Sequence, residues 1–292
     1  MQNWKLTLAY DGTAFHGWQV QPNLRTIQGT LAGALHRITG ESVLPQGSGR
    51  TDAGVHALGQ VASFQLEAPI PAANLQHALN RALPSSIRVL AAEIVPGTFH
   101  ARRSAQRKTY EYRVFLRKDA TNPGALSSRD FIAQGGVLQE AGFPASGFRS
   151  LENDRICSPM LAPFVWNCPL PLDLSTMQQA ATYILGTHDF SSFAASDPDL
   201  ATREADPNSA PSTPIRTVYH SQWAEHDGLL LYRITGSGFL HHMVRNLVGT
   251  FVHAGRGRIA PESIPNILAA RDRSAAGPTA PASGLFLLQV EY

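Results

Sequence analysis

Cysteine is scarce in this chain: Cys157 and Cys168 are the only two among 292 residues, and they do not form a Cys-x-x-Cys pair. Two cysteines can close at most one bridge, which disfavours a disulfide framework or a structural zinc site. Because 43% of the residues are apolar, a chain of this length can bury a sizeable core without such cross-links. We expect a protein of the reducing cytoplasm.

Long apolar runs are lacking as well. No run reaches about 18 apolar residues, the length that a membrane-spanning helix requires. The first residues contain no basic leader followed by an apolar core, which is the pattern of a secretory signal. We therefore expect neither a membrane span nor export.

The loops that bind nucleotides in other proteins are incomplete here. Gly12 and Gly17 have the glycine spacing of a phosphate loop, but Trp18 stands where that loop needs a lysine. Gly47 and Gly49 lack the third glycine of a dinucleotide-binding fingerprint. We therefore expect no nucleotide hydrolysis, no NAD and no other small-molecule cofactor.

A metal role is also disfavoured by the sequence. His241 and His242 are adjacent in a predicted helix, without the glutamate and the i, i+4 histidine of a zinc protease. Adjacent positions on a helix point about 100° apart. We therefore expect one ring to line a cleft and the other to lie at the surface.

Positive charge is clustered rather than abundant. The net charge is only +2, with an isoelectric point near 8.6, and such a mild balance does not by itself indicate nucleic-acid binding. Seven of the 24 basic residues lie from His100 to Lys118, opposed only by Glu111. Two interpretations stay open for this stretch: a face that binds nucleic acid, or a solvated strand edge that charge protects.

Apolar periodicity predicts strands and helices in both halves of the chain. Alternation predicts strands at 4–10, 62–66, 87–95, 109–116, 215–224, 229–235 and 285–292, with a short one inside 164–166. Helical spacing predicts helices at 27–38, 75–82, 175–185 and 240–252. Thr26 is the predicted N-cap of the first helix and Gly40 ends it, while Gly255 is predicted to follow the last.

This repeated mixture predicts an α+β protein of two related halves with mixed, largely antiparallel sheets. We place the halves at 1–105 and 106–292, with an insertion at about 119–173. A second stretch, 195–214, also resists assignment to a helix or a strand. Stretches this long between elements are often functional.

Residues 47–60 contain the highest concentration of candidate site residues in the chain. They contain four glycines, which permit tight turns and close approach of a ligand. In the simpler interpretation Asp52 is a turn residue that bonds its own backbone, with Arg50 as a solvated neighbour. In the functional interpretation the loop presents Asp52 beside the cation of Arg50. That cation would favour the ionised form that a nucleophile or a base requires.

Six blocks of this sequence resemble, in order, the motifs of the tRNA pseudouridine synthase A family. They lie at 10–19, 49–56, 99–102, 108–112, 214–216 and 239–246. The resemblance covers nearly the whole chain. It implies two ferredoxin-like halves whose sheets meet around a central basic cleft, usually in a homodimer, with tRNA as the partner and no cofactor.

The resemblance also implies roles for particular residues. Asp52 matches the catalytic aspartate, Arg216 its ionic partner, and Tyr110 the aromatic residue that packs on the target base. Leu285 resembles the apolar residue that completes the pocket, and Tyr112 is expected in the core. Six further residues fall in family motifs near the cleft, where a structural role is as open as contact with RNA: Arg50, His56, Phe239, His242, Met243 and Arg245.

The implied reaction is the isomerisation of uridine to pseudouridine at or near positions 38 to 40 of the tRNA anticodon arm. A uridine flipped out of the stem would be held by stacking. Asp52 would act on its ribose as a nucleophile or as a base, with chemistry related to that of retaining glycosidases. Three alternatives remain: a non-catalytic RNA-binding module, a synthase for another RNA, and a tRNA-binding enzyme with a different reaction.

Overall fold

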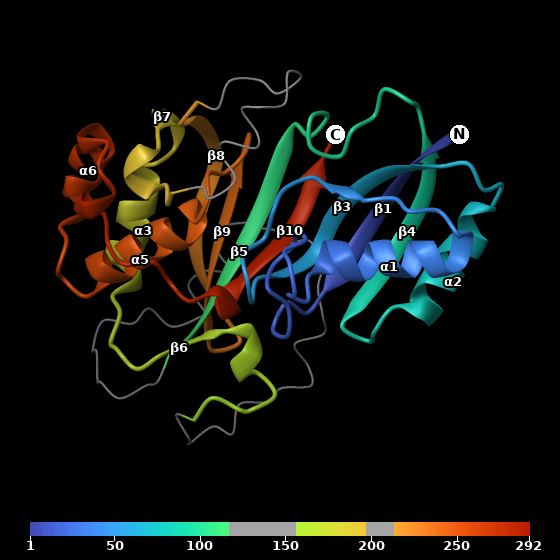
Figure 1. Ribbon diagram of the computed structural model, residues 1–292. Helices are drawn as coiled ribbons and strands as arrows, with labels where there is room; N and C mark the ends of the chain where they lie inside the picture. Colours follow the sequence, from blue (N-terminus) through green and yellow to red (C-terminus); the bar gives the residue numbers. More distant parts are fainter. Residues whose placement is uncertain (117–155, 197–212) are drawn as a thin grey trace, which may run out of the picture.

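One mixed sheet runs through the computed structural model, which describes residues 1–116, 156–196 and 213–292 (Figure 1). The strand order is β4-β1-β3-β10-β5-β9-β8-β7, with β2 paired to β3 and β6 paired to β5. The strands are β1 (Gln2–Tyr10), β2 (Gln46–Gly47), β3 (His56–Leu66), β4 (Ile87–Val95), β5 (Arg107–Leu116), β6 (Trp166–Cys168), β7 (Gly186–Asp189), β8 (Ile215–His226), β9 (Leu229–Gly236) and β10 (Leu285–Glu291). Pairing is antiparallel except between β10 and β3 and between β5 and β6. The predicted α+β class is confirmed.

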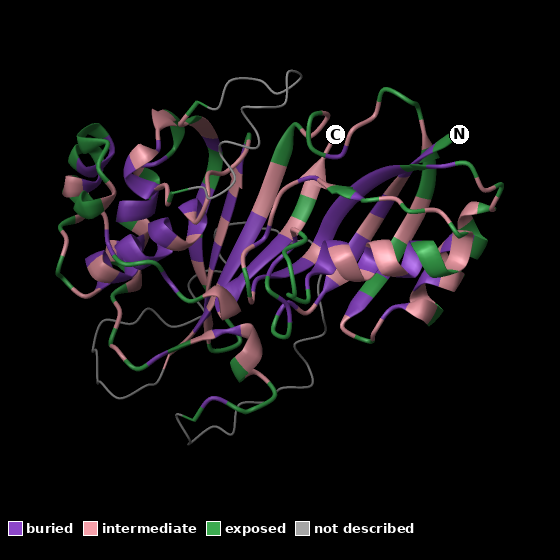
Figure 2. Ribbon diagram, in the orientation of Figure 1, coloured by how far each residue is buried: buried purple, intermediate pink, exposed green. Residues whose placement is uncertain are grey.

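Two groups of helices pack on this sheet. α1 and α2 lie beside the strands β4, β1 and β3, whereas α3 and α5 lie beside β9 and β8 (Figure 1). The helices are α1 (Ile27–Thr39), α2 (Ala72–Ala82), α3 (Leu174–Thr182), α5 (Met243–Gly255) and α6 (Ile264–Ala270), with short 3₁₀ turns η3 (Ala162–Phe164), η4 (Ser191–Phe193), η5 (Pro261–Ser263), η6 (Arg273–Ala275) and η7 (Ala282–Gly284). Buried residues concentrate where helices meet the sheet (Figure 2). None of the helices in the described ranges is long and apolar enough to cross a membrane.

The C-terminal strand β10 joins the two halves of the sheet. Phe286 pairs with His56 of β3 in parallel, and Leu287 pairs with Tyr110 of β5 in antiparallel orientation. The strands of the two halves therefore form one continuous sheet. The boundary predicted at 105–106 falls between β4 and β5 and stays a prediction.

The basic strand β5 is central, not an edge. It lies between β10 and β9, so the interpretation of a charge-protected strand edge is wrong. Glu111 is buried and accepts from Arg113 Nε at 2.9 Å and from Arg233 Nη2 at 2.8 Å. The Arg113 guanidinium also lies 4.0 Å from the centre of the Phe286 ring. Arg113, a member of the basic cluster, therefore stabilises the fold.

Local signals located most elements. Thr26 caps α1 by accepting from the Gly29 N–H, and Gly40 ends the helix with a left-handed φ of 76°. The β8–β9 hairpin turns at Asp227 and Gly228, both with positive φ, as a tight hairpin requires. The predicted short strand is β6, two residues later than expected. Of the stretches 119–173 and 195–214, residues 119–155 and 197–212 lie outside the described residues.

The long helix α5 differs from the prediction at both ends. It begins at Met243 rather than at 240. Gly255 is its last helical residue rather than the residue after it. A Cβ at this position would lie 2.6 Å from Met177 Cγ of α3, so close packing of α3 on α5 explains this glycine.

Glycine-to-alanine substitutions in two helices should have opposite effects on stability. A Cβ on Gly249 of α5 would lie 1.6 Å from the Pro278 carbonyl oxygen, a backbone atom that cannot move aside easily. Gly249→Ala should lower the free energy of unfolding by about 2 kcal/mol or more. The control Gly33→Ala in α1 meets nothing closer than Arg37 Nη1 at 3.6 Å, and it should raise stability by about 0.5–1 kcal/mol. Urea unfolding of both variants checks this, and equal effects would contradict the packing of α5 against residue 278.

Candidate active site

Asp52 lies in the loop 48–55, called here the Asp52 loop, and faces the start of α5. Arg245, in the first turn of α5, donates from Nη1 to Asp52 Oδ2 at 2.9 Å. Its Nε donates to the Ala280 carbonyl at 2.8 Å, which fixes the guanidinium. The side chains of Asp52 and Arg245 are 19% and 15% exposed. The carboxylate therefore has a charge-assisted hydrogen bond and remains partly accessible.

Two imidazole rings face the same carboxylate. His241 Nε2 lies 3.6 Å from Asp52 Oδ1, and His242 Nε2 lies 3.3 Å from Oδ2. The ring centres are 4.0 Å apart. The expectation that one ring lines a cleft while the other points to the surface is therefore wrong. Burial lowers the pKa of His242, and the charge of Asp52 partly opposes this shift.

The backbone at His242 explains why both rings turn the same way. His242 precedes α5 and has φ 59° and ψ 2°, in the left-handed region. The 100° rule for adjacent helical residues does not apply there, because neither histidine lies within the helix. A non-glycine residue in this region is strained, and such strain is often found at functional sites.

A buried hydrogen-bond network holds the Asp52 loop from one side. The Gln60 amide, on β3, donates to the Gly49 carbonyl at 2.9 Å and accepts from Ser48 Oγ at 2.7 Å. Lys108 Nζ, on β5, donates to the Ser48 carbonyl at 2.6 Å. The loop is thus tied to two central strands of the sheet.

The glycine-rich segment 12–17 supports the same loop. Trp18 N–H donates to the Thr51 carbonyl at 3.0 Å, and the hydroxyls of Tyr10 and Thr51 lie 2.8 Å apart. A Cβ on Gly17 would lie 2.6 Å from the Thr51 carbonyl oxygen. A Cβ on Gly47 would lie 2.6 Å from the Trp18 ring. Close packing under the loop therefore requires these glycines.

Tyr110 and Phe239 form an aromatic pair, and the charge of Asp52 acts on the Tyr110 hydroxyl. Their rings meet edge to face, 5.2 Å apart at 84°. Burial raises the pKa of the Tyr110 hydroxyl, and the neighbouring Tyr10 and the charged Asp52 raise it further. Tyr110 is therefore a neutral phenol at physiological pH.

Leu285 and Met243 are buried, whereas Phe239 is partly buried. Leu285 is opposite Tyr112 in the β10–β5 pairing, whereas Leu287 is opposite Tyr110. Tyr112 is fully buried and donates to the Pro281 carbonyl at 2.8 Å, which confirms it as a core residue. Met243 is fully buried at the start of α5. The contact of Leu285 with a bound base stays a prediction.

His56 is buried directly after the Asp52 loop. Its Nδ1 accepts from the Gly12 N–H at 3.1 Å, and its Nε2 lies 3.0 Å from the Pro163 carbonyl. The ring stacks on Phe286 with centres 4.7 Å apart. Burial lowers the pKa of His56, while the nearby Asp11 carboxylate partly opposes that shift. These contacts fit the neutral ring with its proton on Nε2.

The two other predicted cations lie in different places. Arg216, on β8, donates from Nη1 to the carbonyls of Thr213 and Ile215, each at 2.6 Å. Arg245 is a cation that contacts Asp52, and the role of ionic partner expected of Arg216 stays a prediction. Arg50 lines a small cavity of about 100 Å³ beside the Asp52 loop. The full lining is Trp18, Gln19, Gln46, Gly47, Gly49, Arg50 and Arg102.

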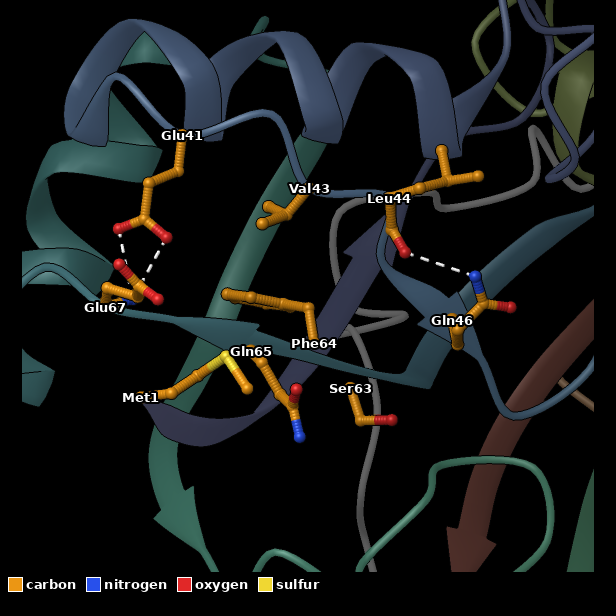
Figure 3. Close-up of a pocket in the computed structure, with 9 residues that line it drawn as sticks. All are labelled: Met1, Glu41, Val43, Leu44, Gln46, Ser63, Phe64, Gln65 and Glu67. Carbon is orange, nitrogen blue, oxygen red and sulfur yellow. Dashed lines mark hydrogen bonds between the residues drawn. The ribbon is translucent and has the colours of Figure 1, made fainter.

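A larger cavity of about 370 Å³ lies along the far half of β3 (Figure 3). It is lined by Met1, Glu41, Val43, Leu44, Gln46, Ser63, Phe64, Gln65 and Glu67. The Glu41 carboxylate already accepts from the backbone N–H groups of Glu67 and Ala68. This carboxylate serves the local fold, so Asp52 remains the stronger candidate for chemistry.

The sequence interpretation missed three parts of the site. His241 was not expected to face Asp52, and its position depends on the left-handed backbone of His242. Gln60 and Lys108 lie inside or beside the recognised motifs, but alternation along a strand does not show which polar residue bonds to a loop. Within the described residues, Asp52, His241 and His242 form a group whose ligand atoms lie within 4.8 Å of one another.

Comparisons with known proteins agree on one family. The family model described as tRNA pseudouridine synthase matches residues 7–102 and 180–292. A curated tRNA pseudouridine synthase A of Solibacter usitatus is 44% identical over 292 residues, covering all of both chains. That of Moorella thermoacetica is 40% identical over 99% of this chain and 98% of the relative. That of Maridesulfovibrio salexigens is 39% identical over the whole chain and 91% of the relative.

Removing the Gln60 amide should loosen the Asp52 loop. Gln60→Met leaves the Ser48 hydroxyl and the Gly49 carbonyl without their buried partner, which should lower the free energy of unfolding by about 1–3 kcal/mol. Amide hydrogen exchange within 48–52 should become faster. Gln65→Met, at an exposed position of the same strand, is the control and should change neither quantity. Unchanged exchange in the first variant would show that the loop does not depend on Gln60.

The buried neutral His56 should make stability fall in mild acid. Because its pKa is lowered in the folded state, the unfolded chain takes up the proton first as pH drops through the ordinary value near 6.5. The free energy of unfolding therefore has its full value above about pH 6.5. It decreases as the pH falls from there towards the folded-state pKa of His56. Urea unfolding is measured between about pH 7.5 and 5. The free energy of unfolding should change less with pH in His56→Gln than in wild type. Identical slopes would mean that His56 is protonated equally in both states.

Proposed function

The chain belongs to the tRNA pseudouridine synthase family, and on that premise we propose that it isomerises uridine to pseudouridine in the tRNA anticodon stem-loop. The uridines are those at or near positions 38 to 40, as the sequence resemblance implies. Asp52 is the catalytic residue in this proposal. Two finer assignments follow from the resemblance alone: a homodimer and a cytoplasmic location.

The observation that carries the proposal is the setting of Asp52. Its carboxylate is bonded to Arg245 at 2.9 Å, in a half-buried loop that the sheet holds in place. Arg245 bonds to Oδ2, so Oδ1 is the oxygen left to meet a substrate. Positioning a reactive group in this way removes much of the entropic barrier to reaction.

The reaction moves one bond and one proton. The bond between uracil N1 and ribose C1′ breaks, the base turns, and a bond forms between C5 and C1′. C5 then loses its proton while N1 gains one, so no electrons, phosphate or water are consumed. Asp52 either attacks C1′ to form a glycosyl ester or removes the proton at C2′ to form a glycal. Both routes use an oxygen of the same carboxylate.

In this proposal the aromatic pair of Tyr110 and Phe239 recognises the base. A uridine in a stem must be flipped out, at a cost of a few kcal/mol, before its ribose can meet a carboxylate. Tyr110, which packs edge to face against Phe239, holds the flipped base by stacking in this proposal, as aromatic side chains do in other enzymes of this kind. Arg50 and Arg102, which share a cavity next to the Asp52 loop, supply charge for phosphate contacts.

The rival from another class is an RNA-binding module without catalysis, and a tritium-release assay separates the two. Wild type, with tRNA carrying tritium at C5 of uridine, should release tritium, because C5 must lose its hydrogen. Asp52→Asn should lower the rate by at least about a thousandfold while binding tRNA with similar affinity, since the variant lacks the nucleophile or base but keeps its shape. Binding by both proteins without release by either would favour the rival.

A further inference from the structure

The imidazole of His241 is oriented with a ring nitrogen towards Asp52. Its Nδ1 lies 2.7 Å from the Ser196 carbonyl oxygen. A carbonyl can only accept, so Nδ1 carries a hydrogen, and a ring with this single hydrogen presents the lone pair of Nε2. That lone pair faces Asp52 Oδ1 at 3.6 Å. In that form both atoms can donate an electron pair to one bound cation.

The second imidazole completes a set of three ligand atoms. His242 Nε2 lies 3.3 Å from Asp52 Oδ2, and all three ligand atoms lie within 4.8 Å of one another. In a tetrahedral zinc site with bonds of 2.0–2.1 Å, neighbouring ligand atoms are about 3.3 Å apart. Small side-chain rotations would therefore bring the three atoms to coordination distance.

The chemistry of the three donors selects the class of ion. Two imidazole nitrogens and one carboxylate oxygen suit zinc-like divalent transition metals rather than magnesium or calcium, which prefer all-oxygen sites. The bond from His241 Nδ1 to the Ser196 carbonyl is the outer contact that histidine ligands of metals usually make. It fixes both the tautomer and the ring direction.

We propose that Asp52, His241 and His242 bind a zinc-class divalent transition-metal ion, and that the bound ion inhibits the enzyme by occupying the carboxylate. Binding depends only on the three side chains. Inhibition rests on the proposed function, because it requires Asp52 to be the reacting group. The site takes the ion and the ribose in turn, not together.

Nearby positive charge limits the affinity of this site. Arg245 Nη1 contacts Asp52 Oδ2 at 2.9 Å, and Arg273 also acts electrostatically on His242. Both guanidinium groups repel a divalent cation. The ion should therefore bind reversibly and be removed readily by a chelator, and Arg245→Gln should bind it more tightly than wild type.

Cobalt(II) and zinc titrations of the full chain test the proposal. Wild type freed of metal should take up one Co²⁺ with visible d–d absorption of a tetrahedral site, and Zn²⁺ should displace it. His241→Gln and His242→Gln should each weaken binding by about tenfold or more. His226→Gln removes an imidazole that is 57% exposed in the distant β8–β9 hairpin, and it should bind as wild type does. Asp52→Asn, which conserves volume, provides the same test if a histidine variant unfolds.

The activity arm distinguishes failure of this proposal from failure of the proposed function. Tritium release by metal-free wild type should fall as Zn²⁺ occupies the site, with the same midpoint as Co²⁺ displacement, and a chelator should restore it. Release that is insensitive to Zn²⁺ at full occupancy would overturn the inhibition. No Co²⁺ spectrum, or equal binding by the ligand variants, would overturn the metal site and leave the synthase assignment intact. A Co²⁺ spectrum without any tritium release would leave the site and overturn the synthase.

Discussion

The ion pair between Asp52 and Arg245 is the contact on which the candidate site depends. Its partners are 193 positions apart, one in a loop before β3 and the other in α5. They meet because β10 inserts between β3 and β5 and brings the two halves of the sheet together. A half-buried charge without its partner is unfavourable. The geometry of the site therefore requires both halves to be folded and correctly paired.

The surroundings of this pair differ from one side to the other. One side is a rigid support, in which Gln60 and Lys108 bond the Asp52 loop to β3 and β5. The other side carries His241 and His242 on a connection whose backbone is left-handed at one residue. Chemistry needs a carboxylate that is fixed in position yet open to a substrate. The support provides the first property, and the partial exposure of Asp52 provides the second.

Local signals in the sequence predicted local structure. They could not predict contacts between residues that are far apart in the chain. The caps of α1 at Thr26 and Gly40 depend on neighbouring residues, so they could be located from the sequence alone. The motif around Asp52 indicated the loop through family resemblance. The family resemblance implied Arg216 as an ionic partner of Asp52, whereas no local pattern predicts the contact that Arg245 makes from α5. The central place of β5 likewise depends on the pairing with β10, far away in the chain.

The two oxygens of Asp52 have different neighbours, and this difference links the reaction to its inhibition. Arg245 bonds to Oδ2, while Oδ1 faces His241 at a distance too long for a hydrogen bond. In the proposed reaction Oδ1 is therefore the atom that approaches the ribose. In the proposed metal site, a cation bound between His241 Nε2 and the carboxylate contacts the same oxygen. The feature that leaves Asp52 available to a uridine thus also leaves it available to a metal ion, and the charge of Arg245 shifts that competition towards the RNA.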